Sequence, residues 1–295
     1  MTAPQYRQAP LPFTGQKRRF LTLYKHLLHE CIPADGAGWT VLDVFGGSGL
    51  LAHTAHRELP AATVIYNDFE DYATRLAHID DTNRLRRELL AVLADVPHNG
   101  RLPPAARAVV HDLIRGFDGF VDYDALSAWL LFSGKVASSL DSIMRNSNYN
   151  RVRQTDYPTA AHYLDGITVI RTDYRDLLPR YTGQPRVLLV LDPPYVNTTQ
   201  DGYHKADYFG MVAFLQLMRM VRPPFIMFSS TRSEFPAWLA LTLQEHLDGW
   251  QHFAGYPSKR SSTRARPTRT TWCTNSDAPK NKATGKGGFR GDFLR

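Results

Sequence analysis

The fold is decided by Val41-Leu42-Asp43-Val44-Phe45-Gly46-Gly47-Ser48-Gly49. Thr40–Val44 is a short apolar run that predicts a buried strand, and a glycine-rich turn follows it directly. Glycine lets the backbone approach a ligand closely, and a helix that starts at such a turn can hold a carboxylate or phosphate on its amides. The spacing is neither the dinucleotide pattern G-x-G-x-x-G nor a phosphate loop. The segment predicts a turn for a nucleoside cofactor, with a purely structural turn as the alternative.

Helix and strand patterns alternate on both sides of this turn. Lys17–Cys31 has apolar residues at helical spacing, residues 50–58 predict a helix that breaks at Pro60, and residues 63–66 predict a second strand. Continuous apolar runs, typical of parallel strands buried on both faces, return at Ile167–Ile170, Val187–Leu191 and Phe225–Phe228. Helical stretches over residues 208–221 and 235–246 separate them. This order predicts an α/β domain with a mostly parallel sheet and crossover helices.

A region without strand rhythm interrupts this pattern. Phe69–Val96 and Tyr123–Met144 each predict a long helix, and Gly, Pro and polar runs surround the second one. We therefore expect a sheet domain formed by residues 11–80 and 161–275, with a helical insertion over residues 81–160. Trp129 and Phe132 are interpreted as residues that pack within the insertion.

Composition excludes several classes of protein. The chain has 295 residues, 43% of them hydrophobic, which suits one large globular domain. No run approaches about 18 apolar residues, so we expect no membrane span, and the first ten residues do not resemble a secretory signal. Two cysteines far apart suggest a reducing, cytoplasmic setting. His53 and His56 share a helical face without a third ligand, so we interpret them as surface or packing residues and expect no metal site.

The positive charge of the chain is concentrated at its end. Residues 257–295 hold ten Lys or Arg and two Asp, which gives +8, whereas the whole chain carries +7. Such a block suits a polyanion, because each neutralised phosphate releases condensed counterions. The five cations that precede or begin a strand-like segment are the candidate phosphate contacts: Lys259, Arg260, Arg264, Arg266 and Arg269. Residues 276–295 form a basic tail that we expect to be flexible.

Two further motifs follow predicted strands. Asp68 lies at the end of the second strand, where a carboxylate can accept both hydroxyls of a ribose, although Asp also commonly caps helices. Leu191-Asp192-Pro193-Pro194-Tyr195 ends a buried strand in a rigid turn. The Asp192 carboxylate and the Pro193 carbonyl offer two acceptors for the hydrogens of an aromatic amine, and Tyr195 offers a face for a planar ring. A rigid connection without function is the alternative.

In this order, the three motifs resemble those of the Dam-type DNA adenine-N6 methyltransferases. Phe13-Thr14-Gly15-Gln16-Lys17 is similar to the aromatic-x-Gly-x-Lys segment of that family, although Pro12 precedes it here. The resemblance implies a Rossmann-like class I fold with a mostly parallel, seven-stranded sheet flanked by helices, and S-adenosylmethionine as cofactor. It implies that Asp192, Pro193, Pro194 and Tyr195 form the catalytic motif. The cofactor residues implied are Phe13, Gly15, Lys17, Asp43, Phe45, Gly47, Ser48, Gly49, Asp68, Asp173 and Asp192.

The resemblance also implies the partner and its place of contact. The substrate would be double-stranded DNA, with a flipped adenine methylated at its amine, in the cytoplasm or nucleoid of a bacterial or phage-infected cell. The insertion, with Arg145, Arg151 and Arg153, and the late basic cluster would select the target sequence. A restriction-modification system, a phage and a stand-alone enzyme are equally compatible with the sequence, and the oligomeric state stays open.

Three alternatives remain at this stage. Cytosine-N4 methyltransferases share nearly the same chemistry, but they more often carry Ser in place of Asp192. RNA adenine is a second possible substrate, because a basic segment does not separate the two polymers. A nucleic-acid-binding relative without catalysis is the third, and intact Asp43, Asp68, Asp192 and Tyr195 argue against it.

Overall fold

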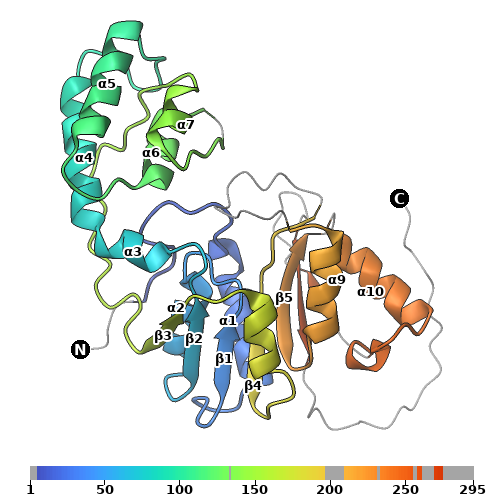
Figure 1. The fold of residues 1–295 in the computed structure, drawn as a ribbon. Coiled ribbons are helices and arrows are strands. Elements are labelled where there is room, and N and C mark those ends of the chain that lie inside the picture. The colour runs from blue at the N-terminus through green and yellow to red at the C-terminus, as the bar shows by residue number, and fades with distance from the viewer. Residues whose placement is uncertain are drawn as a thin grey trace.

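A mostly parallel β-sheet lies at the centre of the computed structural model, and helices cover both of its faces (Figure 1). The structure describes residues 5–132, 134–196, 209–230, 233–254, 258–260 and 269–274. The sheet has the strand order β3-β2-β1-β4-β5-β7-β6. Its strands are β1 (Thr40–Asp43), β2 (Thr63–Asn67), β3 (Ile167–Ile170), β4 (Val187–Leu191), β5 (Phe225–Ser230), β6 (Ser258–Arg260) and β7 (Arg269–Thr274).

Strand β1 lies at the point where the winding of the sheet reverses. Thr40 pairs in parallel with Thr63 of β2 on one side and with Val187 of β4 on the other. The chain that follows β1 therefore goes one way and the chain that follows β4 goes the other, which opens a crevice at their carboxyl ends. The glycine turn follows β1 and Asp192 follows β4, so both motifs reach this crevice.

The mostly parallel α/β sheet with flanking helices fits a Rossmann-like methyltransferase fold. Five strands, rather than seven, are parallel to one another: β3, β2, β1, β4 and β5. Strands β7 and β6 continue the sheet beyond β5, and both of their pairings are antiparallel. The apolar runs predicted from the sequence form the parallel part, and the strand-like segment that begins at Arg269 forms β7.

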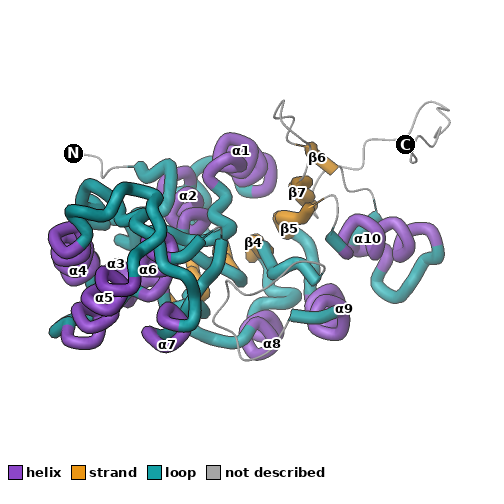
Figure 2. Tube along the Cα trace, turned by 90° about the horizontal axis from the view of Figure 1, so that it is seen from above, coloured by secondary structure: helices purple, strands orange, loops and turns teal. Residues whose placement is uncertain are grey.

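Two apolar cores hold the helices against the sheet. Val41 points into the core shared with α1 (Leu21–Cys31) and α2 (Leu50–Glu58), whereas Leu42 points into the core shared with the helices opposite. Figure 2 shows α1 and α2 on one side of the strands and α8 and α9 on the other. The helices of the second side are α8 (Tyr174–Leu177), α9 (Met211–Met220) and α10 (Glu234–Gln244). Short 3-10 turns occur at η1 (Arg18–Phe20), η2 (Leu178–Arg180) and η3 (Trp250–His252).

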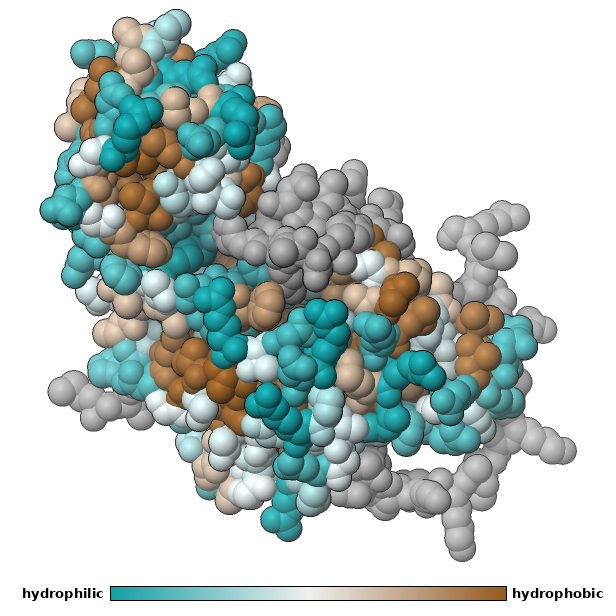
Figure 3. Space-filling view, in the orientation of Figure 1, coloured by the Kyte–Doolittle hydropathy of each residue, from teal (hydrophilic) through white to brown (hydrophobic). Residues whose placement is uncertain are grey.

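The helical insertion stands as a separate lobe beside the carboxyl end of the sheet (Figure 1). The chain enters it through α3 (Tyr72–Ala77), and the lobe contains α4 (Ile79–Val92), α5 (Pro104–Gly116), α6 (Tyr123–Leu130) and α7 (Leu140–Met144). Figure 3 shows this lobe above the sheet domain, with apolar side chains gathered on the face turned to the viewer. The sequence predicted helices in this region, but the predicted bounds of the individual helices were wrong.

The two long helices predicted for this region are each divided. His78 leaves helical geometry (φ −111°, ψ 26°) and separates α3 from α4, and Leu131 is extended and ends α6. Helix α5 was not predicted. Trp129 is 2% exposed and packs as expected, but Phe132 follows the end of α6 and is 60% exposed, so its interpretation as a packing residue was wrong.

A buried arginine joins the insertion to the sheet domain. Arg75 in α3 donates from Nε to both carboxylate oxygens of Asp122, at 3.1 and 3.0 Å, and pairs with Asp124 at 2.9 Å. It also donates to the carbonyl of Pro12 at 2.9 Å. Burial lowers the pKa of the Arg75 guanidinium, but Asp122 and Asp124 raise it more, so the pKa lies above its ordinary value. One cation therefore ties α3, the start of α6 and the N-terminal segment together.

The chain segments that enter and leave the insertion are bonded to each other. Asn83 donates from Nδ2 to the carbonyl of Tyr157 at 2.9 Å, and the amide of Tyr157 donates back to Asn83 Oδ1 at 2.7 Å. Both residues are buried.

None of the helices in the described part of the chain has the length and apolar character needed to span a membrane.

Candidate functional site

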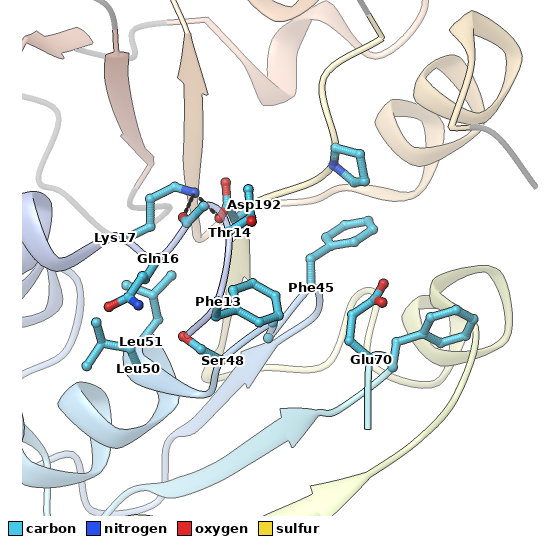
Figure 4. A pocket seen from close by; sticks show the side chains of 15 residues that line it. Phe13, Thr14, Gln16, Lys17, Phe45, Ser48, Leu50, Leu51, Glu70 and Asp192 are labelled. Carbon is cyan, nitrogen blue, oxygen red and sulfur yellow. Dashed lines mark hydrogen bonds and ion pairs between the residues drawn. The ribbon is translucent and has the colours of Figure 1, made fainter. Parts of the chain in front are cut away.

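A cleft opens at the carboxyl ends of β1 and β4, next to the glycine turn (Figure 4). It measures about 590 Å³ out to its open mouth. Four parts of the chain form its wall: the N-terminal segment, the turn after β1, the loop after β2 and the loop after β4. The lining residues are Phe13, Thr14, Gly15, Gln16, Lys17, Phe45, Gly46, Gly47, Ser48, Leu50, Leu51, Phe69, Glu70, Asp192 and Pro194.

The glycines of the turn are required by their neighbours. A Cβ on Gly46 would lie 2.2 Å from the ring of Tyr66, and Gly47 has a φ of +52°, which side chains other than glycine rarely adopt. A Cβ on Gly47 would also lie 2.9 Å from the ring of Phe13. The N-terminal segment therefore packs directly on the turn, and the backbone of the turn forms one wall of the cleft.

Three charged side chains gather beneath this cleft. Lys17 is 6% exposed and donates from Nζ to the carbonyl of Gly15 at 2.8 Å and to Oδ2 of Asp192. Asp43, at the end of β1, is fully buried. Burial raises the pKa of Asp43 to about 7, and the carboxylate of Asp192 adds to this effect, while Lys17 opposes it. The ammonium of Lys17 thus orients Asp192 from the N-terminal side.

Asp43 has an unusual environment for a carboxylate. Neither of its oxygens has a partner in hydrogen-bonding geometry within the part of the chain that the structure describes, although the Ala52 amide, like Lys17, lowers its pKa. A buried carboxylate without such partners costs several kcal/mol unless a cation or donor joins it. The site therefore fits a ligand that brings positive charge to the glycine turn, such as the ammonium of an amino-acid moiety.

Asp68, the predicted ribose acceptor, is engaged elsewhere. Its Oδ1 accepts from the Tyr72 amide at 2.7 Å and lies 2.8 Å from the Tyr66 hydroxyl, and its Oδ2 accepts from the Ala73 amide at 2.7 Å. The carboxylate therefore caps the start of α3, and Asp68 is 3% exposed. Glu70, two residues later, lines the cleft instead. No motif pointed to Glu70; its place just after a strand end is the only signal in the sequence.

The loop after β4 is held from below by α10. The Val196 amide donates to Oε2 of Glu234 at 3.1 Å, and Glu234 is 7% exposed. Burial raises the pKa of Glu234, although two backbone hydrogen bonds oppose the shift. Asp192 and Pro194 line the cleft, whereas Pro193 and Tyr195 lie outside its lining. Glu234 was not predicted from the sequence.

The structure brings most of the predicted cofactor residues together. Those that line the cleft are Phe13, Gly15, Lys17, Phe45, Gly47, Ser48 and Asp192. Asp43 lies beneath them, and Gly49 is the left-handed N-cap of α2, with a φ of +70°. Asp173 caps α8 by accepting from the Arg175 amide at 2.8 Å, and it lies outside the lining of the cleft.

The predicted DNA contacts fall into two groups. Arg145, Arg151 and Arg153 are exposed on the insertion. Lys259 and Arg260 lie on β6 and Arg269 begins β7, and these two strands pair in antiparallel fashion. Arg264, Arg266 and the tail at 276–295 lie outside the described residues. Within the described ranges, no group of three or more His, Cys, Asp or Glu side chains could hold a metal ion.

One comparison identifies a relative of the chain. A protein of Haemophilus influenzae named "Putative methyltransferase" is 48% identical over 252 residues, which cover 85% of this chain and 85% of the relative. No known protein-family profile matches the chain.

Proposed function

Since the chain belongs to the same methyltransferase family as this Haemophilus influenzae protein, we propose that it methylates the exocyclic amine of adenine in double-stranded DNA. The single observation behind this proposal is the cleft itself. It joins the glycine turn, which suits a nucleoside cofactor, to Asp192, which suits an aromatic amine.

The proposed cofactor is S-adenosylmethionine, which supplies a sulfonium methyl group when bound. The unpartnered carboxylate of Asp43 and the backbone of Gly47 and Ser48 fit the charged amino-acid part of this molecule. The rings of Phe13 and Phe45, which line the same cleft, fit its apolar and planar parts (Figure 4). We propose that Glu70, rather than Asp68, accepts from the ribose hydroxyls, because Asp68 already caps α3.

The amine of the target base is a weak nucleophile, because its lone pair is delocalised into the ring. We propose that the Asp192 carboxylate and the Pro193 carbonyl accept hydrogen bonds from the two N–H groups of the amine. These bonds would draw the nitrogen toward tetrahedral geometry. Lys17 fixes the carboxylate from the other side. Positioning of this kind can contribute many kcal/mol to catalysis without a covalent intermediate.

The base must leave the DNA helix before it reaches the cleft, at a cost of a few kcal/mol. We propose that Tyr195 stacks on the extruded ring and recovers part of this cost. Glu234 would keep the loop from Asp192 to Val196 in place while the base enters.

Asp192→Ala tests the proposal. We expect methyl transfer to duplex DNA to fall by a factor of about 10³ or more, because the amine loses its main acceptor. Calorimetry with S-adenosylhomocysteine should give nearly unchanged binding. Asp176→Ala, at an exposed carboxylate on α8, is the matched control and should keep full activity.

Sequencing of modified bases in DNA from expressing cells identifies the product directly. Methylated adenine at a fixed sequence is the expected result. Full activity of Asp192→Ala would contradict the mechanism, and methylation of cytosine or of RNA would contradict the substrate.

A further inference from the structure

A second cleft lies between the sheet domain and the insertion. It measures about 790 Å³ out to its mouth, and it shares Phe13, Thr14 and Glu70 with the first cleft. The two clefts are therefore neighbours with a common wall. A group bound in the second cleft would lie directly beside a group bound in the first.

The insertion supplies most of the wall of this second cleft. Helix α6 and the loop after it contribute Ser127, Leu131 and Lys135, and Arg151 follows from the returning chain. Residues 131–153 contain four basic side chains and one acidic one. Lys135 and Arg151 are exposed and can contact a phosphate, although Glu70 and Asp124 also line the cleft and balance their charge.

One exposed aromatic ring follows α6, and it packs on a half-buried tyrosine that follows α7. Phe132 is 60% exposed, and its ring lies 5.5 Å from the ring of Tyr149 at an interplanar angle of 42°. It follows Leu131, which lines the cleft, and it is the most exposed aromatic side chain among the described residues. An exposed ring next to cations is typical of surfaces on which nucleobases stack.

The backbone holds this ring and these cations in fixed positions. The Tyr149 amide donates to the Leu130 carbonyl and the Arg151 amide to the Trp129 carbonyl, both at 2.9 Å. Arg151 also donates from its guanidinium to the carbonyl of Leu131 at 3.3 Å. These hydrogen bonds hold the backbone on both sides of the aromatic pair in place, which lowers the entropy cost of ordering this segment when a ligand binds.

We propose that this second cleft and the exposed ring of Phe132, which lies outside its lining, together bind a nucleotide that neighbours the target base. Its phosphate would lie on Lys135 and Arg151, and its base would stack on Phe132. The inference rests on the proposed function, because it needs a polynucleotide as substrate. It adds a second subsite to the cleft that holds the amine, and it assigns to Phe132 and Arg151 a role in selecting the bases around the target.

The test compares Phe132→Ala and Arg151→Ala with two control variants. Val109→Ala removes a 49%-exposed apolar side chain from α5, and Arg87→Ala removes an exposed arginine from α4, both outside the lining of the cleft. DNA affinity is measured by fluorescence anisotropy on a duplex that carries the DNA sequence methylated by the wild-type protein. Calorimetry with S-adenosylhomocysteine reports on the first cleft.

We expect Phe132→Ala to bind the duplex about tenfold more weakly, as for one lost base–aromatic stack. Arg151→Ala should lower the slope of log affinity against log salt by about 0.9, as for one lost phosphate contact. Both variants should bind S-adenosylhomocysteine like the wild type, and both controls should bind DNA like the wild type.

A duplex with one abasic position beside the target makes the test specific. Removal of the stacked base should weaken binding by the wild type but not further weaken binding by Phe132→Ala. Two results would overturn the inference and leave the proposed function intact. In the first, an abasic site at each position next to the target weakens binding by Phe132→Ala as much as it weakens binding by the wild type. In the second, Phe132→Ala and Val109→Ala bind the duplex with equal affinity. A wild-type protein that neither binds nor methylates duplex DNA would overturn both.

Discussion

Asp43 combines full burial with the absence, among the described residues, of a partner in hydrogen-bonding geometry for either carboxylate oxygen. At the scale of single residues this is a destabilising arrangement, because its charged form is poorly solvated. A group that reduces the stability of the protein alone but matches a charged ligand is typical of binding sites. The free energy of unfolding of the unliganded protein should therefore depend on the protonation of Asp43.

The protonation of Asp43 makes the free energy of unfolding depend on pH. The pKa of Asp43 is raised from 3.8 to about 7, so the folded state keeps a proton that the unfolded state loses between these values. The contribution of Asp43 to the free energy of unfolding should thus decline by about 4 kcal/mol as pH rises from about 4 to 7. Chemical denaturation of the wild type and of Asp43→Asn over this range measures the difference.

Asp112→Asn, at an exposed carboxylate of α5, is the control and should follow the wild-type curve. A constant difference between wild type and Asp43→Asn from pH 4 to pH 8 would show that Asp43 is ionised in the folded protein throughout.

Glu70 and Asp68 allow a second comparison of single residues. We expect Glu70→Gln to lose about 1.5–3 kcal/mol of binding free energy for S-adenosylhomocysteine, as for a lost charge-assisted hydrogen bond. An analogue without ribose hydroxyls should bind both proteins equally. Asp68→Asn should instead lower the free energy of unfolding by about 1 kcal/mol, because it weakens the cap of α3.

Calorimetry with the two ligands distinguishes the residues. If Asp68→Asn, and not Glu70→Gln, loses the preference for the hydroxylated ligand, the ribose acceptor is Asp68 as the sequence suggested.

Single residues were predictable where a motif follows a strand directly. Gly47 and Asp192 line the cleft because short turns after buried strands leave little freedom to their positions, whereas Lys17 lies before the first strand and was expected there only from the resemblance. The position of Glu70 in the cleft could not be predicted, and the role proposed for it depends on the amides of α3 that Asp68 already binds. The exposure of Phe132 was equally inaccessible, since it depends on where α6 ends.

At the scale of elements, the contact between α3 and α6 depends on the buried cation Arg75, which pairs with Asp122 and with Asp124. The side chains of Arg75 and Asp122 are 8% and 1% exposed. Removal of one member of a buried pair typically costs about 3–5 kcal/mol. Because Asp124 and the Pro12 carbonyl still bind Arg75, we expect Asp122→Ala to lower the free energy of unfolding by about 3 kcal/mol, at the lower end of this range, and to expose the insertion to limited proteolysis.

Asp112→Ala provides the comparison, because its ion pair with Arg115 lies on the surface. A loss below about 1 kcal/mol is expected there. Equal effects of the two substitutions would contradict a special role of Arg75.

Strands and helices were unequally predictable from the sequence. Ile167–Ile170 and Val187–Leu191 were predicted with the observed bounds. Strand β4 is buried on both faces, as its continuous apolar run predicted, whereas β3 is an edge strand with no fully buried residue, so the expectation that it is buried on both faces was wrong. Helix α5 has only three buried residues, Val110, His111 and Ile114, so its apolar pattern is sparse. Its stability comes from packing against α4 and α7, which the local sequence does not reveal.

At the scale of the whole molecule, charge is distributed unevenly. Residues 1–256 carry a net charge of −1, and the remainder carries +8. Replacement of Lys259, Arg260, Arg264, Arg266 and Arg269 by Gln should weaken DNA binding. It should also reduce the slope of log affinity against log salt by up to about 4.5, at about 0.9 per phosphate contact. Titrations at several salt concentrations measure this slope, and an unchanged slope would reject the assignment.

The architecture followed from the order of elements, whereas the relation of its parts did not. Alternating strands and helices limit an α/β chain to a few topologies, so a mostly parallel sheet was predictable. The placement of the insertion depends on contacts such as Arg75 with Asp122 and Pro12, which join segments far apart in sequence. No local pattern encodes such contacts.

The paired hydrogen bonds between Asn83 and Tyr157 have a consequence for engineering and for evolution. They bring the two ends of residues 84–156 together, so this segment can be exchanged as a cassette without a change in the spacing of the sheet. Asp122 and Asp124 would have to be retained in any replacement, because Arg75 stays behind in the host. A library of such chimaeras would test whether, under the proposed function, this segment selects the sequences that are methylated.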